Sequence, residues 1–142
     1  RNKDFIELVR LLDANLQERN GAIQVEYSPH NVLGFIGTVV VAYEGDFAVG
    51  CGCFRPHGEN TVEMKRMFVR PEYRGQGIAK GVLGELEIWA RELGYARAVL
   101  ETGQWQTEAL RLYPHCGYQR IANYEPYTAF DTSICFGKTL DQ

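Results

Sequence analysis

The chain has 142 residues, 45% of them hydrophobic and 23% charged, with a formal net charge of -3. This composition fits one globular domain over residues 1–142 with a buried core. No apolar run approaches the ~18 residues that cross a bilayer, and the N-terminus lacks the residue order of a secretion signal. The acidic balance and the absence of a basic stripe argue against a nucleic-acid-binding protein.

The cysteines show no metal-binding or redox pattern. Cys51, Cys53, Cys116 and Cys135 form no Cys-x-x-Cys pair and have no His partner at zinc-site spacing. Cys51 and Cys53 would share one face of a strand. We therefore expect buried, reduced thiols, no metal site, and a reducing, cytoplasmic compartment.

The first predicted element is an amphipathic helix over about residues 4–19. Asp4 is suited to the N-cap, with Glu7 three residues on, and Gly21 follows the end. The polar, turn-rich residues 27–37 predict a loop or irregular helix over the substrate site.

Three strands are predicted next, over residues 38–43, 47–54 and 61–69. The turns between them, at residues 44–46 and 57–60, are too short for crossover helices. The three strands should therefore form an antiparallel meander.

A glycine-containing loop separates the third strand from a second amphipathic helix. Pro71 cannot donate to a strand ladder, and Gly75 and Gly77 permit backbone conformations and close approaches that a Cβ would forbid. Because a helix N-terminus presents unpaired N–H groups and a partial positive charge, the loop suits a phosphate or pyrophosphate. Three cations should crowd this place: Arg70, Arg74 and Lys80. Local positive charge in an acidic chain indicates a small phosphorylated ligand.

The second helix is predicted from an apolar stripe of Ile78, Val82, Leu86, Trp89 and Leu93, which Gly94 closes. Gly81 and Gly84 lower its helix propensity, which suggests close packing against the sheet or the ligand. A strand over residues 96–100 follows and should run parallel to the third strand, as in strand–helix–strand units.

A third helix is predicted from Ala109, Leu110 and Tyr113, which share one helical face. Pro114 and Gly117 end it. Further strands should open at Tyr118 and cover residues 134–138.

Two motifs resemble signatures of the GNAT acetyltransferases. Residues 74–79, Arg-Gly-Gln-Gly-Ile-Ala, resemble the family's acyl-CoA loop, Gln/Arg-x-x-Gly-x-Gly/Ala, and follow a strand as that loop does. Residues 106–118 resemble the family's Asn-x-x-Ala-x-x-x-Tyr followed by Gly-Phe/Tyr, with Gln106 where many members have Asn. Neither the dinucleotide fingerprint nor the Walker loop fits the glycines. The resemblance covers residues 38–120 and 134–138.

The resemblance implies a fold and an activity. The fold is of the α/β class: a mixed central sheet with an antiparallel N-terminal meander, a splayed parallel strand pair, and helices on both faces. The activity is transfer of an acetyl group from acetyl-CoA, as co-substrate, to a primary amine by direct attack in a ternary complex. The alternative is a catalytically silent acyl-CoA-binding domain. The implied partner is a small-molecule or peptide amine, with a homodimer as a candidate assembly and neither nucleic acid nor membrane.

The resemblance also implies the cofactor contacts. The pantetheine would add to the third strand, and the amides of residues 76–80 would take the pyrophosphate. The expected cofactor-binding residues are Met67, Phe68, Val69, Arg74, Gly75, Gln76, Gly77, Ile78, Ala79, Lys80 and Gln106. A backbone N–H within residues 67–69 would face the thioester carbonyl.

Two side chains carry the implied chemistry. Tyr113 occupies the position of the family's usual general acid, although it could instead fill the interface between helix and sheet. Glu63 occupies a position from which many members take the amine proton through ordered water. A strand carboxylate can equally pair with Lys65 or Arg66, and the alternative bases are Glu101 and His57. The acceptor site should be lined by aromatic and charged residues: Tyr27, Phe54, Arg55, Tyr124, Glu125 and Tyr127.

Overall fold

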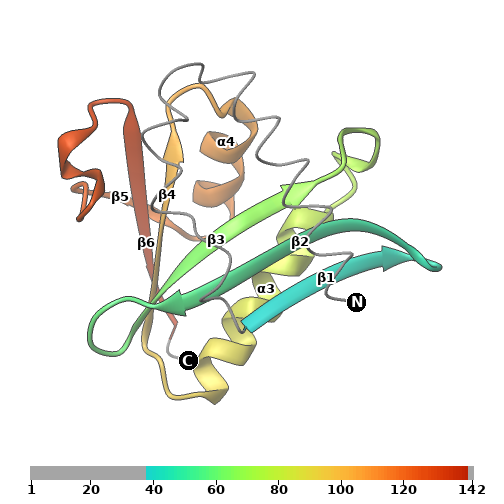
Figure 1. Ribbon diagram of the computed structural model, residues 1–142, viewed down its shortest axis with the longest axis horizontal. Coiled ribbons are helices and arrows are strands. Elements are labelled where there is room, and N and C mark those ends of the chain that lie inside the picture. Colours follow the sequence, from blue (N-terminus) through green and yellow to red (C-terminus); the bar gives the residue numbers. More distant parts are fainter. Residues whose placement is uncertain (1–37, 141–142) are drawn as a thin grey trace.

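The structure, a computed structural model, describes residues 38–140 (Figure 1). The helix expected over residues 4–19 and the loop expected over residues 27–37 lie outside the described residues. The described elements are β1 (Thr38–Glu44), β2 (Phe47–Pro56), β3 (Thr61–Val69), η3 (Pro71–Tyr73), α3 (Ile78–Glu92), β4 (Arg97–Gly103), α4 (Thr107–His115), β5 (Gln119–Ile121), η4 (Tyr127–Ala129) and β6 (Ser133–Thr139). No helix among these is long and apolar enough to cross a bilayer.

The strands form one mixed sheet in the order β1-β2-β3-β4-β6-β5. β1, β2 and β3 pair antiparallel, which confirms the predicted meander. Its turns use Gly45, with φ of 61°, and Asn60, with φ of 59°. β3 and β4 pair parallel, as the strand–helix–strand unit predicted, so the expected mixed α/β fold is confirmed.

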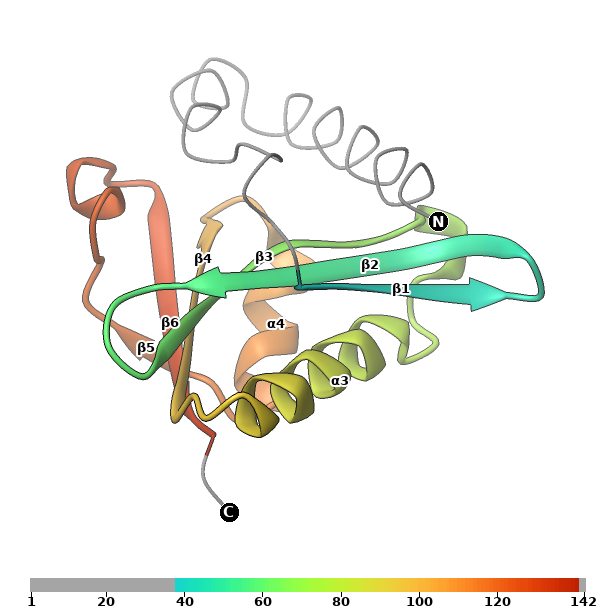
Figure 2. The ribbon, with the colours of Figure 1, turned by 60° about the horizontal axis from the view of Figure 1, so that its bottom comes forward.

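The parallel pair is short because the two strands diverge. Residues 61–63 of β3 pair with residues 97–99 of β4, and no later residues of the two strands pair. β4 pairs along its whole length with β6 instead. α4 lies beside the point where β3 and β4 separate (Figures 1 and 2). The second half of β3 therefore has no described strand on its β4 side, which is the splay that the family resemblance implied.

β3 contains a β-bulge where its register against β2 shifts between Cys51 and Cys53. Arg66 and Met67 of β3 both oppose the single residue Gly52 of β2. Arg66 adopts φ of 58°, a left-handed conformation that costs a non-glycine residue of order 1–3 kcal/mol. Such strained residues cluster at functional sites, so the bulge indicates a functional role for this part of β3.

Both described helices pack into one hydrophobic core. α3 runs along one face of β1–β3 (Figure 2) and buries Val82, Leu83 and Leu86. α4 contributes Tyr113 to the same cluster. Leu93 was expected in the buried stripe, but it is 55% exposed because α3 ends there in its C-cap.

A smaller hydrophobic cluster covers the opposite face of the meander. It contains Cys51 and Cys53 together with Ala48 and Phe68. All four cysteines are free; Cys116 is half-buried, and the other three are buried, as expected.

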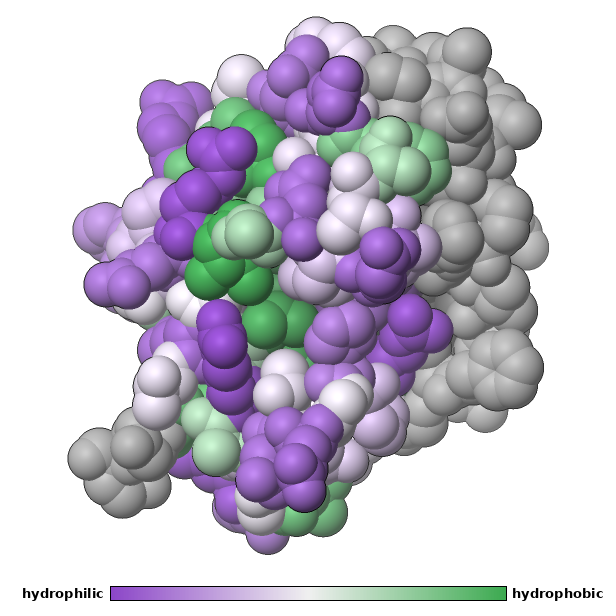
Figure 3. All heavy atoms as spheres, turned by 90° about the vertical axis from the view of Figure 1, so that its left-hand side faces the viewer, coloured by the Kyte–Doolittle hydropathy of each residue, from purple (hydrophilic) through white to green (hydrophobic). Residues whose placement is uncertain are grey.

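The β5 side of the molecule is shown in space-filling form in Figure 3. Hydrophilic residues interrupt the hydrophobic ones across this face. The predicted homodimer is not tested by this surface and stays a prediction.

The close approach between α3 and the sheet is made by glycines of β2. A Cβ added at Gly52 would lie 2.4 Å from Sδ of Met67 and 3.0 Å from two side chains of α3. A Cβ at Gly81 or Gly84 would meet nothing within 4 Å. Close packing of these two helix glycines was predicted against the sheet or the ligand. The contact with the sheet was wrong, because the helix turns both glycines away from its buried face, and the contact with the ligand stays a prediction.

This difference predicts opposite effects for two glycine-to-alanine changes. Gly52→Ala should destabilise the fold by about 1–3 kcal/mol, since the added methyl overpacks the interface with α3. Gly84→Ala should stabilise it by about 0.5–1 kcal/mol, since the methyl has room and alanine favours the helix. Urea unfolding of both variants measures the two free energies. Losses of equal size would contradict the assignment of the close approach to β2.

Candidate functional site

A cleft of about 820 Å³ lies beside the second half of β3, between the loop that follows it, the first turn of α3, and α4. Its lining is Met67, Phe68, Val69, Tyr73, Arg74, Gly75, Gly77, Ile78, Ala79, Lys80, Gln106, Glu108, Ala109, Arg111, Leu112, Tyr113 and His115. Every cofactor residue predicted from the sequence lines it except Gln76. The volume lies within the usual ~300–1,000 Å³ of small-molecule sites.

The loop is shaped by two glycines in the left-handed region. Gly75 has φ of 82°, and Gly77 has φ of 83° and is the N-cap of α3. A Cβ at either would meet nothing within 4 Å, so the space beside the loop is open. The first turn of α3 carries no acidic residue, which leaves the partial positive charge of the helix N-terminus available to an anion.

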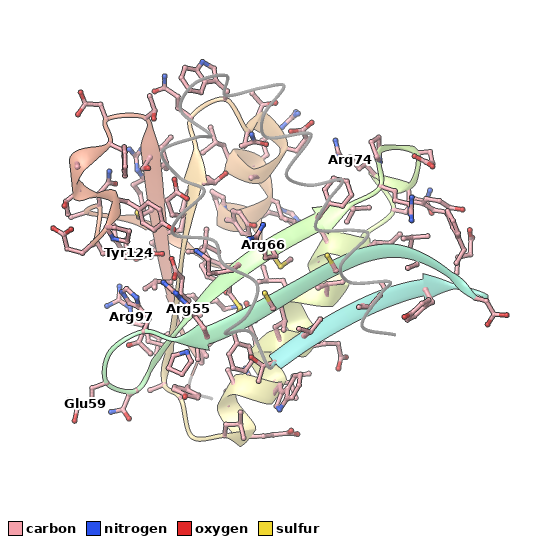
Figure 4. The ribbon with its side chains drawn as sticks, in the orientation of Figure 1. Arg55, Glu59, Arg66, Arg74, Arg97 and Tyr124 are labelled. Carbon is pink, nitrogen blue, oxygen red and sulfur yellow. The ribbon has the colours of Figure 1, made fainter. Side chains whose placement is uncertain are left out.

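Arg74 ties the loop to both walls of the cleft. Its Nε donates to the Val69 carbonyl at 2.9 Å, and its guanidinium lies 5.5 Å from the centroid of the Phe68 ring. Its Nη1 lies 3.8 Å from Oε2 of Glu108 on α4. Figure 4 shows Arg74 at the loop after β3. Arg74 therefore bridges the strand, the loop and α4.

The other basic residues of the region are arranged only partly as the sequence predicted, with Lys80 in the lining of the cleft. Arg70 does not line the cleft: its Nε donates to the Ala48 carbonyl at 2.6 Å, and its guanidinium lies 4.5 Å from the centroid of the Phe47 ring. Arg111 and His115 of α4 do line the cleft, and the sequence analysis missed them. Their spacing of four residues places them on one helix face, which was a usable signal.

Tyr113 lies in the cleft wall formed by α4. It is 6% exposed, and its ring centroid is 5.9 Å from that of Tyr118 and 6.0 Å from that of Phe136. Burial raises the pKa of the Tyr113 hydroxyl well above its usual range, and the charges of Cys116 and Glu101 add to this. The hydroxyl is therefore protonated at neutral pH.

A second group of polar side chains lies on the sheet face opposite α3, near the point where β3 and β4 separate. Glu63 is 1% exposed there. Its carboxylate accepts hydrogen bonds from Arg55 Nε at 3.1 Å and from the Tyr124 hydroxyl at 2.9 Å. Lys65 Nζ lies 3.8 Å from Oε1 of the same carboxylate. Arg55 and Tyr124 lie at the same end of the sheet in Figure 4. Of the two pairings weighed from the sequence, the structure forms the one with Lys65.

Glu101 of β4 belongs to the same polar group. Its carboxylate accepts a hydrogen bond from Ser133 Oγ at 2.8 Å. Burial raises the pKa of Glu101, the Ser133 hydrogen bond and the charge of Lys65 oppose this rise, and the charge of Glu63 adds to it, so that the pKa lies at about 7. A carboxyl with this pKa is matched to accepting a proton at neutral pH.

Aromatic residues complete the polar group. Lys65 Nζ donates to the Tyr127 hydroxyl at 3.1 Å, and burial lowers the pKa of Lys65. The His57 ring centroid lies 4.6 Å from that of Tyr124. Arg55, Tyr124 and Tyr127 thus lie together, as expected for an acceptor site.

Three other residues were expected to line the acceptor site. Phe54 packs in the core beside α3, with its ring centroid 5.9 Å from that of Trp89, so its predicted place was wrong. Tyr27 lies outside the described residues. Glu125 is exposed and accepts a hydrogen bond from Thr128.

The β3 bulge joins the cleft and the polar group. Lys65 belongs to the polar group, and Met67, two residues later, lines the cleft. Across this junction the charge of Glu101 also raises the pKa of Tyr113, so the two groups act on each other electrostatically. No His, Cys, Asp or Glu side chains of residues 38–140 are grouped so that three or more could hold a metal ion.

The chain resembles acetyltransferases in both sequence and structure. The family model described as "Acetyltransferase (GNAT) family" matches residues 7–118. N-acetyltransferase 8B of Rattus norvegicus is 28% identical over 120 residues, which cover 84% of this chain and 49% of that protein. An IAA acetyltransferase of Azospirillum brasilense is 34% identical over 102 residues, which cover 71% of this chain and 67% of that protein. The chain spans about half the length of the rat protein.

Solved structures show the same fold. A Klebsiella pneumoniae protein assigned as a candidate acyl-CoA N-acyltransferase has a TM-score of 0.77 at 32% identity, over 97% of this chain and 90% of that chain. A GNAT family acetyltransferase from Elizabethkingia anophelis with acetyl-CoA bound has a TM-score of 0.67 at 20% identity, over 80% of this chain and 82% of that chain.

Proposed function

Because this chain belongs to the acetyltransferase (GNAT) family, we propose that it transfers the acetyl group of acetyl-CoA to a primary amine of a small molecule or peptide. The observation that supports this proposal is the cleft, which is lined by Tyr113 and by all the predicted cofactor residues except Gln76. The family uses acetyl-CoA, and acyl transfer is its reaction.

The cleft supports one placement of the cofactor. The pyrophosphate would bind the N–H groups at the start of α3, with Lys80 and Arg111 supplying positive charge around it and His115 lining the same space. The pantetheine would lie along residues 67–69 of β3, on the side where no described strand pairs with it. The thioester would then lie near the bulge, at the junction with the polar group.

The reaction that we propose is a direct attack. The amine nitrogen bonds to the thioester carbon, the carbon–sulfur bond breaks, and a backbone N–H of residues 67–69 stabilises the oxyanion formed between these two events. The amine gives its proton to Glu101, and Tyr113 protonates the departing thiolate. We assign the base to Glu101 rather than Glu63, because Glu63 is engaged by Arg55 and Tyr124 while the pKa of Glu101 lies at about 7.

The wider setting is part of the proposal. Residues 1–142 would form one acetyltransferase domain. The free cysteines support a reducing, cytoplasmic compartment. Direct attack needs the acceptor in the ternary complex, so the polar group around Glu63 and Glu101 would face the amine.

Calorimetry and a thiol-release screen test the proposal together. Acetyl-CoA should bind much more tightly than NAD or ATP, and some amines should release free CoA thiol. Tight binding without thiol release for any amine would favour the silent acyl-CoA-binding domain. Equal binding of the three nucleotides would reduce the loop to a generic anion site.

The role of Glu101 predicts a pH profile. The transfer rate at saturating substrate should rise as pH passes through about 7, where Glu101 loses its proton. Glu101→Gln should lose this rise and keep only the one toward the amine pKa of ~10.4. Single-turnover rates across the range from about pH 5 to about pH 10 measure both. A rise near pH 7 that survives in Glu101→Gln would assign the base elsewhere.

Substitutions of two residues beside Glu101 should move the pH at which the transfer rate rises, in opposite directions. The Ser133 hydrogen bond lowers the pKa of Glu101, so Ser133→Ala should shift the rise to higher pH. The charge of Glu63 raises that pKa, so Glu63→Gln should shift the rise to lower pH.

Loss of activity in Glu101→Gln should not reflect unfolding. The folded-state pKa of about 7 lies above the ordinary 4.5, so ionisation of Glu101 costs stability as pH rises, and the neutral amide avoids this cost.

A further inference from the structure

Two buried thiols of β2 contact the carbonyl groups of the β3 bulge. Cys51 Sγ lies 3.4 Å from the carbonyl oxygen of Arg66, and Cys53 Sγ lies 3.2 Å from the carbonyl oxygen of Lys65. Both cysteines are 0% exposed. Burial raises the pKa of both thiols to about 12, so at neutral pH they keep their protons and act as donors rather than nucleophiles.

The two carbonyls belong to the peptide units on either side of Arg66. This residue has φ of 58°, which a non-glycine residue holds only where its surroundings enforce it. The bulge also places two residues opposite Gly52, so regular ladder pairing does not fix this part of β3. The thiol contacts are therefore well placed to hold the bulge in its conformation.

The peptide that joins Arg66 to Met67 links the thiol to the cleft. This peptide is trans, so its C=O and N–H groups are coplanar and point in opposite directions. Cys51 holds the Arg66 carbonyl on the β2 side, and the Met67 N–H must then point away from β2. That is the side of β3 where β4 has separated, and Met67 lines the cleft there.

We propose that Cys51 is a positioning residue for acetyl transfer: its thiol donates a hydrogen bond to the Arg66 carbonyl and so directs the Met67 N–H at the thioester oxygen. Cys53 secures the preceding peptide in the same way. The consequence for the rate rests on the proposed function. The effect on the Met67 amide does not, because that amide can be observed without any substrate.

Substitutions at Cys51 separate the effect of losing its hydrogen-bond donor from the effect of changing the packing around it. Cys51→Ala and Cys51→Val remove the donor, and valine keeps the apolar volume should alanine prove too unstable. Cys51→Ser keeps a donor. Val41→Ala is the matched control, because Val41 pairs with Cys51 across β1 and β2 and packs in the same cluster. Each variant is assayed by single-turnover transfer at saturating acetyl-CoA and, without ligand, by the NMR residual dipolar coupling of the Met67 N–H, which reports the direction of that bond.

The alanine and valine variants should lose about tenfold in rate, because a misaimed donor retains part of an effect whose full loss costs ~10²–10³. They should also change the dipolar coupling of the Met67 N–H relative to the parent. Cys51→Ser and Val41→Ala should keep the dipolar coupling of the parent and stay within about threefold of its rate, an effect well below that of a lost donor.

Three outcomes decide the matter. An unchanged dipolar coupling of the Met67 N–H in Cys51→Ala and Cys51→Val overturns the proposal, whatever the rate does. A loss of rate in Val41→Ala as large as that in Cys51→Ala also overturns the proposal, because it would show a general packing effect. A changed dipolar coupling in the alanine and valine variants of a protein that transfers no acetyl group supports the positioning role of Cys51, and it is the proposed function that then fails.

Discussion

Gly77→Val should weaken acetyl-CoA binding by about 100-fold or more, which corresponds to ~2.7 kcal/mol. Gly77 lines the cleft and is the N-cap of α3, at the point where the pyrophosphate would meet the backbone. A branched side chain there occupies the open space beside the loop. It also disfavours the φ of 83° that orients the N–H groups of the loop. Calorimetry with acetyl-CoA measures the loss.

Gly94→Val, just after the other end of α3, is the control for the effect of backbone strain alone. Gly94 has φ of 95°, and a Cβ there would also meet nothing within 4 Å. Both variants should therefore lose stability in thermal unfolding. Only Gly77→Val should lose the ligand, because Gly94 does not line the cleft. If Gly77→Val binds acetyl-CoA as tightly as Gly94→Val, the loop does not hold the cofactor.

The local part of the fold was predictable because short-range signals specify it. The turns at Gly45 and Asn60 fix the meander, and the predicted third strand matches β3 over residues 61–69. The cofactor cleft was predictable for the same reason: most of its residues belong to one continuous strand, loop and helix.

Features that depend on tertiary contacts were not predictable. β6 lies between β4 and β5, an order that long-range pairing alone decides. No glycine in the sequence indicates the bulge at Arg66, and the register shift is visible only in the pairing of β3 with β2. The side chain of Arg70 leaves the cleft because it finds the Ala48 carbonyl and the Phe47 ring on β2.

The choice between the two bases shows the same limit. Glu63 and Glu101 are both strand carboxylates, and nothing in their local sequence ranks them. Arg55 and Tyr124 engage Glu63 from other parts of the chain. Burial and the Ser133 hydroxyl set the pKa of Glu101. Roles that depend on the environment of a carboxylate therefore need the folded chain.

The general acid gives the other large prediction. Tyr113→Phe should lower the rate of acetyl transfer by ~10²-fold or more, the usual range for loss of a positioned general acid. The ring and its contacts with Tyr118 and Phe136 remain, so acetyl-CoA binding should be nearly unchanged. Because burial keeps the pKa of the hydroxyl well above neutral, the parent holds this proton throughout the working pH range. The rate ratio of the two proteins should therefore be nearly constant across neutral pH.

Tyr118→Phe is the matched control for the loss of a buried hydroxyl. Tyr118 is 3% exposed, and its ring lies against that of Tyr113. Its hydroxyl donates a hydrogen bond of 2.9 Å to Glu87 of α3, and Tyr118 is not part of the cleft lining. Its loss should lower stability, since it removes a hydrogen bond from a buried carboxylate, but should leave the transfer rate close to that of the parent.

The decisive measurement is single-turnover transfer to a reactive amine, with all three proteins saturated with acetyl-CoA so that binding and product release do not enter. A thiolate is a fair leaving group, since its free thiol has a pKa near ~8.5, and it could leave unaided or take the amine proton through water. In that case Tyr113→Phe would stay within about threefold of the parent, far below the range of general acid catalysis. Tyr113 would then serve to pack the helix against the sheet or to position the cofactor.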